Sequence, residues 1–176
     1  MKKKYPIIYA FIDSQNLNLG TNKDVYNKRG KKIYKGWKLD YKKFRVYLKD
    51  KFHVSKAFLF IGYIRGNERL YNNLKRWGYE LIFKPTVKDN SGKSKGNIDA
   101  ELVLYSAAIE YRNYDKAVIV SGDGDFHCLH KYLDENKKLL KIIIPNMKSE
   151  SSLLRQFQHY KFFIEYEKVK LEYIKK

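Results

Sequence analysis

Cysteine and long apolar segments are both scarce in this chain. Cys128 is the single cysteine among 176 residues, which excludes an internal disulfide framework and a cysteine-rich zinc module and agrees with a reducing cytoplasm. No segment has the long uncharged apolar run that a membrane-spanning helix requires. The first apolar run is interrupted by Asp13, Gln15 and Asn16, so it predicts a strand and not a signal peptide. We therefore expect a cytoplasmic protein without a membrane segment.

Acidic residues are few compared with basic ones. The chain has 19 Asp and Glu against 37 Lys and Arg, which gives a net charge of +18. A surface this basic attracts polyanions over long range, so nucleic acid is the expected partner. The 16% share of aromatic residues argues against disorder despite this charge. We expect a single domain over residues 1–176, in which residues 167–176 form a charged helical tail.

Short apolar runs alternate with helical periods along the chain. The pattern predicts strands over residues 5–12, 55–64, 79–83, 117–120, 139–144 and 162–166. It predicts helices over residues 39–52, 68–77, 98–111, 126–135 and 151–157. Residues 17–38 are polar and basic and predict a loop or hairpin, and residues 86–97 predict a loop. Strand alternating with helix implies right-handed crossovers, and thus a three-layer α/β/α sandwich with a mainly parallel central sheet.

Carboxylates recur where predicted strands end. The buried run at 117–120 is followed by SGDGD, in which one residue separates Asp123 from Asp125. Asp13 follows the first apolar run in the same way. Asp99 begins a predicted helix. In open parallel sheets, ligands bind outside the carboxyl ends of the strands, where the strand order reverses. Four carboxylates from three remote segments can therefore converge, and such a group is costly unless a cation neutralises it.

Three motifs in order carry a resemblance to a known family. They are FIDSQN at residues 11–16, KGNID at 95–99 and SGDGDF at 121–126. With this order and spacing, the chain resembles the NYN domain family, a branch of the PIN-like ribonuclease superfamily with a Rossmann-like topology. The resemblance implies metal-dependent hydrolysis of phosphodiester bonds in RNA. Because PIN-like relatives often dimerise, a homodimer is an open alternative for this chain. The resemblance also implies a set of Mg²⁺ or Mn²⁺ ligands: Asp13, Asp99, Asp123 and Asp125.

One position departs from the family's pattern. Many relatives carry a further acid six residues after the aspartate of the KGxxD motif, where this chain has Tyr105. This departure leaves open a catalytically weak or inactive RNA-binding module of the same fold. A phosphatase of the haloacid dehalogenase type is a third interpretation, because GDGD resembles its acidic motif. That class requires a second acid two residues after the nucleophilic aspartate, whereas Gln15 lies two residues after Asp13.

Several polar residues near the motifs are candidates for substrate binding. Arg65 and Lys95 fall in loops expected at the carboxyl edge of the sheet, where a cation would meet phosphate. Asn16 is interpreted equally as a helix cap or as a residue that positions substrate or Asp13, and Ser121 as a partner of a backbone amide or of a metal-bound water. Basic segments interleaved with aromatic residues suit single-stranded nucleic acid. These segments are residues 28–38, 42–43 and 88–95, with Tyr26, Tyr34, Trp37 and Tyr41 beside the first of them.

Each candidate also has a purely structural interpretation. An isolated GDGD is as readily an Asp-Gly turn that caps the next helix, and Asp99 alone would only complement a helix dipole. His127, Cys128 and His130 suggest a zinc site, because histidines at i and i+3 share a helix face. Without a fourth ligand this set is poor, and packing is the favoured role for these three residues.

Overall fold

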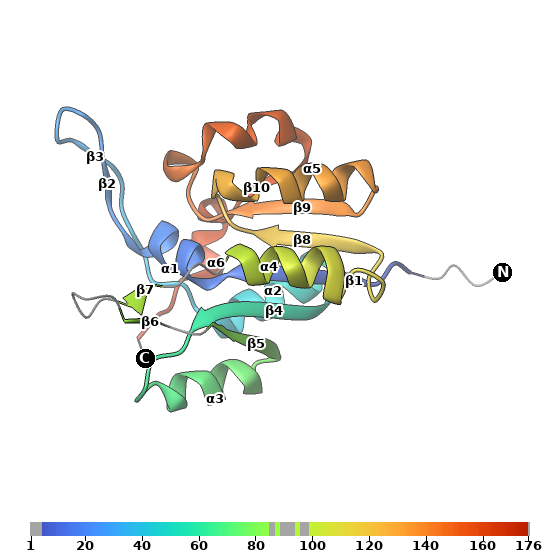
Figure 1. Cartoon of the computed structure of the whole chain (residues 1–176). Coiled ribbons are helices and arrows are strands. Elements are labelled where there is room, and N and C mark those ends of the chain that lie inside the picture. The colour runs from blue at the N-terminus through green and yellow to red at the C-terminus, as the bar shows by residue number, and fades with distance from the viewer. Residues whose placement is uncertain (1–4, 85–86, 89–93, 96–98, 176) are drawn as a thin grey trace.

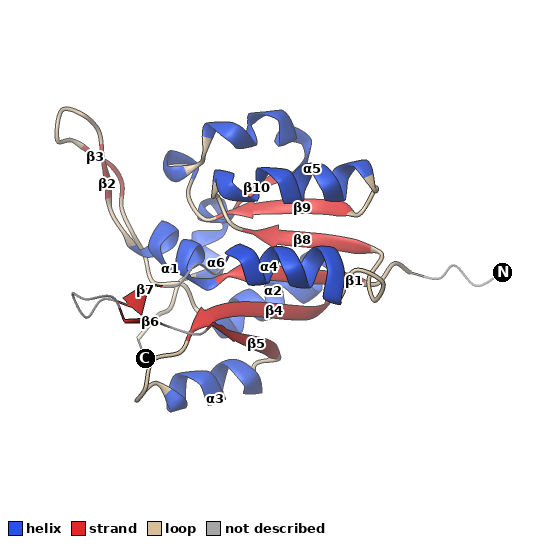
Figure 2. Cartoon of the chain, viewed as in Figure 1, coloured by secondary structure: helices blue, strands red, loops and turns tan. Residues whose placement is uncertain are grey.

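A six-stranded parallel sheet forms the centre of the protein. The structure is a computed structural model and describes residues 5–84, 87–88, 94–95 and 99–175. The strands lie in the order β10-β9-β8-β1-β4-β5, and every neighbouring pair is parallel (Figure 2). Their bounds are Ile8–Asp13 for β1, Val54–Gly62 for β4, Tyr79–Lys84 for β5, Lys116–Val120 for β8, Leu139–Ile144 for β9 and Lys161–Phe163 for β10.

Helices cover both faces of this sheet, as Figure 1 shows. One core contains side chains from α1 (Ser14–Asn22), α2 (Tyr41–Phe52), α3 (Glu68–Arg76) and α6 (Lys168–Leu171). The second core contains side chains from α4 (Asp99–Leu104), α5 (His127–Glu135) and the 3-10 segment η4 (Ser152–Tyr160). A π-helical segment, η1 (Tyr105–Ile109), continues α4, and a 3-10 turn, η2 (Gly124–Phe126), precedes α5. The predicted three-layer α/β/α sandwich with a parallel sheet is confirmed.

The central strand β1 shows how the sequence separates the two cores. Ile8, Ala10 and Ile12 belong to the core on the α1 and α2 side, whereas Tyr9 and Phe11 belong to the core on the α4 and α5 side. This is the two-residue alternation of a strand, applied to a strand that is apolar on both faces because both faces are covered. Continuing the alternation, the side chain at position 13 points to the α4 side of the sheet.

Two small antiparallel hairpins lie beyond the carboxyl ends of the central strands. The first pairs β2 (Val25–Tyr26) with β3 (Lys32–Tyr34) and projects from the body of the molecule (Figure 1). The second pairs β6 (Val87–Lys88) with β7 (Ser94–Lys95). The expected basic hairpin within residues 17–38 is thus present. Residues 86–97 were predicted as a loop, and their described part contains this second short pair of strands.

Three local predictions are wrong. The helix α1 at Ser14–Asn22 was not predicted, because its sequence is polar and shows no apolar periodicity. Asp13 stabilises its start by accepting hydrogen bonds from two backbone N–H groups. The strand expected over 162–166 is β10 at Lys161–Phe163, after which residues 164–167 form a 3-10 turn. The predicted helical tail from residue 167 is reduced to α6, Lys168–Leu171, because Glu172 turns to pair with Leu39.

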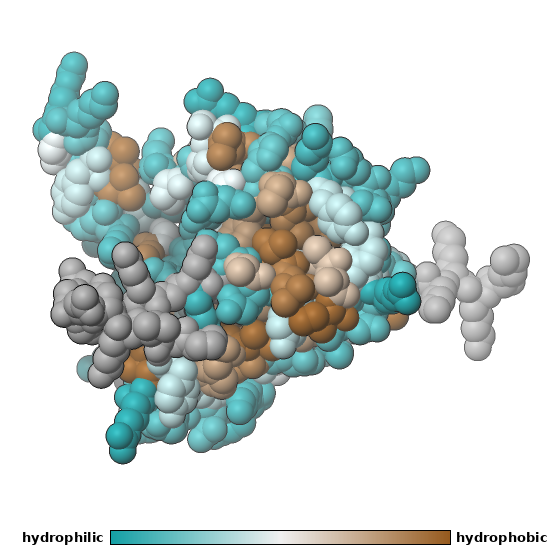
Figure 3. All heavy atoms as spheres, in the orientation of Figure 1, coloured by the Kyte–Doolittle hydropathy of each residue, from teal (hydrophilic) through white to brown (hydrophobic). Residues whose placement is uncertain are grey.

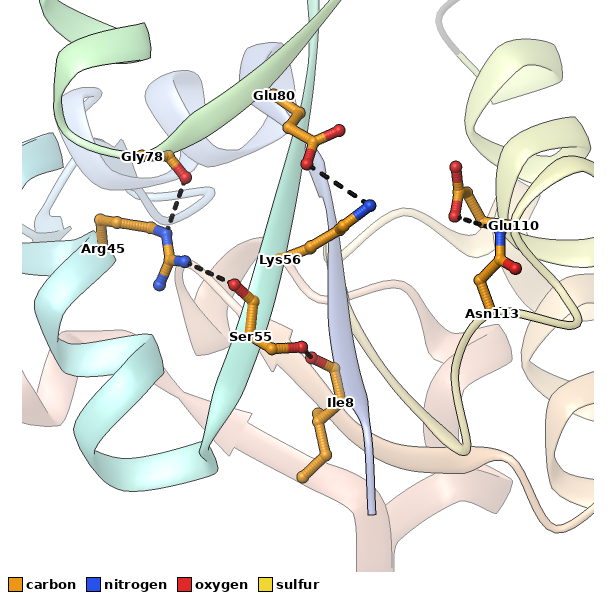
Figure 4. Close-up of polar contacts among 8 residues, drawn as sticks. All are labelled: Ile8, Arg45, Ser55, Lys56, Gly78, Glu80, Glu110 and Asn113. Atoms are coloured by element: carbon orange, nitrogen blue, oxygen red, sulfur yellow. Dashed lines mark hydrogen bonds and ion pairs between the residues drawn. The ribbon is translucent and has the colours of Figure 1, made fainter. Parts of the chain in front are cut away.

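The amino ends of the strands are held together by polar contacts (Figure 4). Arg45 on α2 donates from Nε to the carbonyl of Gly78 and from Nη2 to the carbonyl of Ser55, both at 3.0 Å. Ser55 Oγ in turn donates to the carbonyl of Ile8 at 3.0 Å. The guanidinium thus joins α2, β4 and the start of β5 at the edge opposite the acidic motifs.

Apolar side chains are exposed over α4 and η1, where Figure 3 shows a brown area on the face toward the viewer. Leu104 is 53% and Ile109 is 51% exposed. Within the described part of the chain, no helix is both long and apolar enough to span a membrane.

Candidate active site

The acidic motifs meet where the strand order of the sheet reverses. From β1 the chain continues to β4 and β5 on one side, and it later forms β8, β9 and β10 on the other. β1 ends at Asp13, and β8 ends one residue before Ser121. Since these neighbouring strands are parallel, both ends lie at the same edge of the sheet, where such folds leave a crevice.

Asp13 is both the last residue of β1 and the N-cap of α1. Its Oδ1 accepts hydrogen bonds from the backbone N–H groups of Gln15 and Asn16, each at 3.0 Å. Its Oδ2 lies 3.5 Å from the hydroxyl oxygen of Ser121. The side chain is only 5% exposed. Capping therefore occupies one carboxylate oxygen and leaves the other directed at the neighbouring acidic loop.

Hydrogen bonds join the two motifs across the strand switch. Asn16 Oδ1 accepts from the backbone N–H of Gly122 at 2.9 Å, and Ser121 Oγ accepts from the backbone N–H of Asp123 at 3.2 Å. Because only the amide oxygen of Asn16 can accept a hydrogen bond, its NH₂ group remains a donor. The two residues predicted to bind substrate thus orient the acidic loop in this structure, and their substrate contacts stay a prediction.

Two of the other predicted carboxylates act on the pKa of Asp13. Burial is the largest cause that raises the pKa of Asp13 to about 6, and the carboxylates of Asp99 and Asp123 also raise it. The backbone N–H groups of Asn16 and Gln15 act in the opposite direction. Asp99 reaches this group because it is the first residue of α4, which packs on β1. The site therefore brings carboxylates of remote segments close enough for the charges of Asp99 and Asp123 to act on Asp13.

The remaining predicted residues lie further from this group. Asp125 is exposed and does not line the pocket described below; its backbone N–H donates to Asp123 Oδ1 at 3.0 Å. Arg65 is exposed in the turn after β4 and is also not among the described lining residues. The side chain of Lys95 lies outside the part of the chain that the structure describes. Metal binding by Asp125 and phosphate binding by Arg65 and Lys95 stay predictions.

A pocket of about 580 Å³ opens over these carboxylates. Asp13, Asp99 and Asp123 line it together with Asn16 and residues of α1. Its other walls come from the segment that follows α1 and from the segment that follows β9. The described lining residues in those walls are Lys23, Asp24, Val25, Asn146 and Ser149.

Asn146 is a lining residue that sequence reasoning missed. Its side chain is fully buried, and Oδ1 accepts from the backbone N–H of Lys148 at 2.7 Å. Within the described residues, Nδ2 has no hydrogen-bond partner. Close packing brings this segment to the pocket, since a Cβ at Gly20 of α1 would lie only 2.7 Å from Pro145. A usable signal existed, because Asn146 follows the apolar run KIII as Asp13 and Ser121 follow theirs.

Tyr105 packs against the sheet. Its ring centroid lies 5.5 Å from that of Phe60 and 6.0 Å from that of Phe58, and its side chain is partly buried in the second core. Tyr105 does not line the described pocket. The position at which the family resemblance implied a further acid therefore contributes to the aromatic core of this chain.

The residues His127, Cys128 and His130 do not form a zinc site. Cys128 is exposed, whereas His130 is completely buried against the ring of Phe157. Burial, and secondarily the nearby His127, lowers the pKa of His130 to about 3, so the imidazole is neutral. Neither ring nitrogen of His130 has a hydrogen-bond partner among the described residues. The packing role predicted for this histidine agrees with its surroundings.

The donor atoms at the pocket suit a hard divalent cation. Carboxylate and amide oxygens are the ligands that Mg²⁺ and Mn²⁺ prefer, and a bound cation would offset the burial and the neighbouring carboxylates that raise the pKa of Asp13. Among the described residues, no three His, Cys, Asp or Glu side chains already form a closed metal cluster. Mg²⁺ usually keeps several of its waters, so it does not require a closed set of protein ligands.

The parallel sheet and the carboxylates at its switch point define a PIN-like α/β domain. The family model described as "NYN domain" matches residues 8–165. The chain belongs to the NYN domain family, whose members have a PIN-like nuclease fold. The resemblance carried by the three motifs is thus confirmed at the level of the family.

A solved structure has the same fold. The crystal structure of a protein of unknown function, VPA0982, from Vibrio parahaemolyticus RIMD 2210633 superposes with a TM-score of 0.68 and 21% sequence identity. The alignment covers 93% of this chain and 96% of that one. At this identity the similarity shows the fold alone. No curated protein matches the sequence significantly.

Proposed function

We propose that this NYN domain is a metal-dependent ribonuclease that cleaves phosphodiester bonds at the pocket lined by Asp13, Asp99 and Asp123. The observation that carries the proposal is the convergence of these carboxylates from remote segments on one pocket of a strongly basic chain. In a chain with a net charge of +18, the gathering of three carboxylates at one pocket is explained better by a functional role than by a structural one. A carboxylate with a perturbed pKa in a cleft, as at Asp13, is typical of functional sites.

The carboxylates would hold Mg²⁺ or Mn²⁺, with Asp13 at the end of β1, Asp123 in the loop after β8 and Asp99 at the first turn of α4. When bound, such an ion neutralises the phosphate and lowers the pKa of a coordinated water. The protein's own contribution is to orient these groups. Ser121 and Asn16 hold the Asp123 loop against β1, and the NH₂ groups of Asn16 and Asn146 offer neutral donors to phosphate oxygens. Lys23, on the pocket wall, supplies a positive charge to the same substrate.

The proposal is tested by end-labelled RNA and DNA incubated with Mn²⁺, Mg²⁺ or a chelator. We expect cleavage of RNA with either metal, weaker cleavage of DNA, and no cleavage with the chelator. Equal cleavage in the presence of the chelator would contradict the proposed chemistry.

We predict that Asn146→Asp lowers kcat/KM for RNA by about 10- to 100-fold. The exchange keeps the oxygen that accepts from Lys148 but removes the NH₂ donor, and a hydrogen bond to a charged group contributes roughly 1.5–3 kcal/mol. Single-turnover cleavage measures the effect. The matched control is Asn113→Asp on the exposed segment before β8, where the amide contacts only Glu110 among the described residues. An unchanged rate for Asn146→Asp would remove this amide from the substrate site.

Tyr105 favours one alternative function, an RNA-binding domain without turnover. Its ring occupies the position where an additional acid would otherwise be available. This alternative predicts salt-dependent RNA binding and no cleavage with any divalent metal. The cleavage assay with Mn²⁺, Mg²⁺ or a chelator, combined with an RNA-binding isotherm, distinguishes the ribonuclease from the RNA-binding domain.

A further inference from the structure

The hairpin beside the pocket concentrates the positive charge of the molecule. Residues 23–38, here called the cationic arm, contain seven basic residues and one acid, so about a third of the chain's net charge lies in this short segment. Figure 3 shows the arm as a hydrophilic projection from the body of the protein. Its basic residues are Lys23, Lys28, Arg29, Lys31, Lys32, Lys35 and Lys38.

The base of the arm is fixed at the wall of the pocket. Lys23, Asp24 and Val25 are both the first residues of the arm and part of the pocket lining. Asp24 Oδ1 accepts from the backbone N–H of Gly36 at 2.8 Å, and Asp24 Oδ2 pairs with Lys32 Nζ at 2.5 Å. An isolated two-stranded hairpin is marginally stable in water, so these contacts supply order that the two short strands lack.

Packing against α1 holds the returning strand. The backbone N–H of Trp37 donates to the carbonyl of Thr21 at 2.8 Å, and the hydroxyl of Tyr34 donates to the same carbonyl at 3.1 Å. The Trp37 side chain is buried in the first core. At Gly36 a Cβ would lie 2.0 Å from the carbonyl oxygen of Asn22, so only glycine permits this close approach.

The tip presents cations in a defined turn. Asn27 Oδ1 accepts from the backbone N–H groups of Arg29 and Lys31, both at 2.9 Å, and Gly30 adopts a φ of +73°. Lys28, Arg29 and Lys31 are exposed, and none of the three has an ion pair among the described residues. The positive charge at the tip is therefore available to an external anion.

From these observations we infer that the arm binds the backbone of a single-stranded segment of nucleic acid that extends out of the pocket. Arg29 lies four positions after Val25 of the pocket wall, a reach of at most about 13 Å at ~3.3 Å per residue. At ~3.4 Å per nucleotide along a stacked strand, this reach spans at most about four phosphates. Tyr26 is 55% exposed beside these cations and provides a ring on which a base stacks.

The inference rests on the proposed function and assigns its substrate class. The substrate is a polynucleotide of several nucleotides, and not a dinucleotide or a small phosphate ester. A nucleic acid is favoured over an acidic lipid surface because the arm rises from the wall of the pocket in which a phosphodiester would be cleaved. The contribution of the arm should therefore grow with strand length and disappear for a dinucleotide.

The test compares two triple variants that remove the same charge. Lys28→Gln/Arg29→Gln/Lys31→Gln changes the tip and retains Asn27 and Gly30. The control, Lys49→Gln/Lys75→Gln/Arg76→Gln, removes exposed cations from the C-terminal halves of α2 and α3. Binding to a single-stranded 20-nucleotide RNA is measured with a chelator present, over a range of salt concentrations, together with metal-dependent cleavage of that RNA and of a dinucleotide.

For the tip variant we expect affinity about 100-fold weaker at 0.1 M salt and a salt slope smaller by about 2, from roughly 0.7 per lost phosphate contact. Cleavage of the dinucleotide should be unchanged, and the control variant should keep the salt slope of the parent. Equal RNA affinity of the two triple variants would overturn the inference. Binding to acidic lipid vesicles is measured in parallel, and a tip variant that loses vesicle binding but keeps RNA binding would also overturn it. If the tip variant loses RNA binding while the parent cleaves nothing, the arm is supported and the nuclease proposal fails.

Discussion

Asp13→Asn is expected to reduce metal-dependent RNA cleavage by about 1,000-fold or more while making the protein more stable. An amide is a weak ligand for Mg²⁺ or Mn²⁺, and a loss of ~4 kcal/mol in transition-state stabilisation corresponds to roughly three orders of magnitude in rate. The Oδ1 of asparagine continues to accept from Gln15 and Asn16, so the cap of α1 is retained.

The stability half of this prediction follows from the raised pKa of Asp13. Burial and the neighbouring carboxylates raise this pKa from 3.8 to about 6. Above pH 6 the carboxyl is ionised in both states and the folded state carries the full penalty, ~3 kcal/mol at 1.36 kcal/mol per unit. This destabilisation by the ionised Asp13 carboxylate decreases only as the pH falls from about 6 toward 3.8. Removing the charge should therefore stabilise the protein at pH 7 by about 2 kcal/mol, since the amide accepts the cap hydrogen bonds more weakly.

Urea unfolding at pH 7 with a chelator measures this gain, and adding Mn²⁺ should stabilise the parent more than the variant. The matched control is Asp50→Asn on the exposed face of α2, for which we expect no change in either rate or stability. If Asp13→Asn loses 1 kcal/mol or more of stability, the carboxylate is chiefly a structural cap.

The second large effect concerns acid stability and His130. The pKa of this buried imidazole is lowered from 6.5 to about 3, chiefly by burial. Below pH 6.5 the unfolded chain binds a proton that the folded state does not, so stability is lost progressively as the pH falls from 6.5 to about 3. At 1.36 kcal/mol per unit, the loss from this group is ~2 kcal/mol at pH 5 and ~5 kcal/mol at pH 3.

His130→Leu should remove this loss. Leucine fills the apolar site beside Phe157 and eliminates two buried nitrogens that have no hydrogen-bond partner among the described residues, so stability at pH 7 should rise by about 1 kcal/mol or more. Chemical unfolding between pH 7.5 and 5 should show a decline about 2 kcal/mol smaller than that of the parent. The control, His159→Leu, changes an exposed histidine and should leave the pH profile as in the parent. Identical pH profiles for His130→Leu and the parent would show that His130 is protonated in the folded state.

The sheet could be predicted because its strands are apolar on both faces. The run AVIV at 117–120 is buried and LLKIII at 139–144 is mostly buried, and both are interpreted as strands without knowledge of their partners. The helix α1 could not be found in this way, because its polar sequence is stabilised by the cap at Asp13 and by packing of Gly20 against Pro145. Both contacts bring together residues that the chain's periodicity does not relate.

The candidate site was predictable to the extent that topology dictates it. Asp13 and Asp123 were expected together because parallel strands end at one edge, and both line the pocket. The motif GDGD could not distinguish Asp123 from Asp125, since the direction of each side chain depends on the turn that follows β8. Asn146 was missed although it follows an apolar run, because its place at the pocket depends on the close packing of Pro145 against α1.

The most direct test of the account is single-turnover cleavage of labelled RNA in Mn²⁺ by the parent and by Asp123→Asn, with circular dichroism melting of both proteins. Asp123 Oδ1 accepts from the backbone N–H of Asp125, a contact that asparagine preserves. We predict that the variant melts as the parent does and cleaves at least about 1,000-fold more slowly, by the same loss of ~4 kcal/mol. Equal cleavage by the two folded proteins would contradict the assignment of catalysis to this pocket.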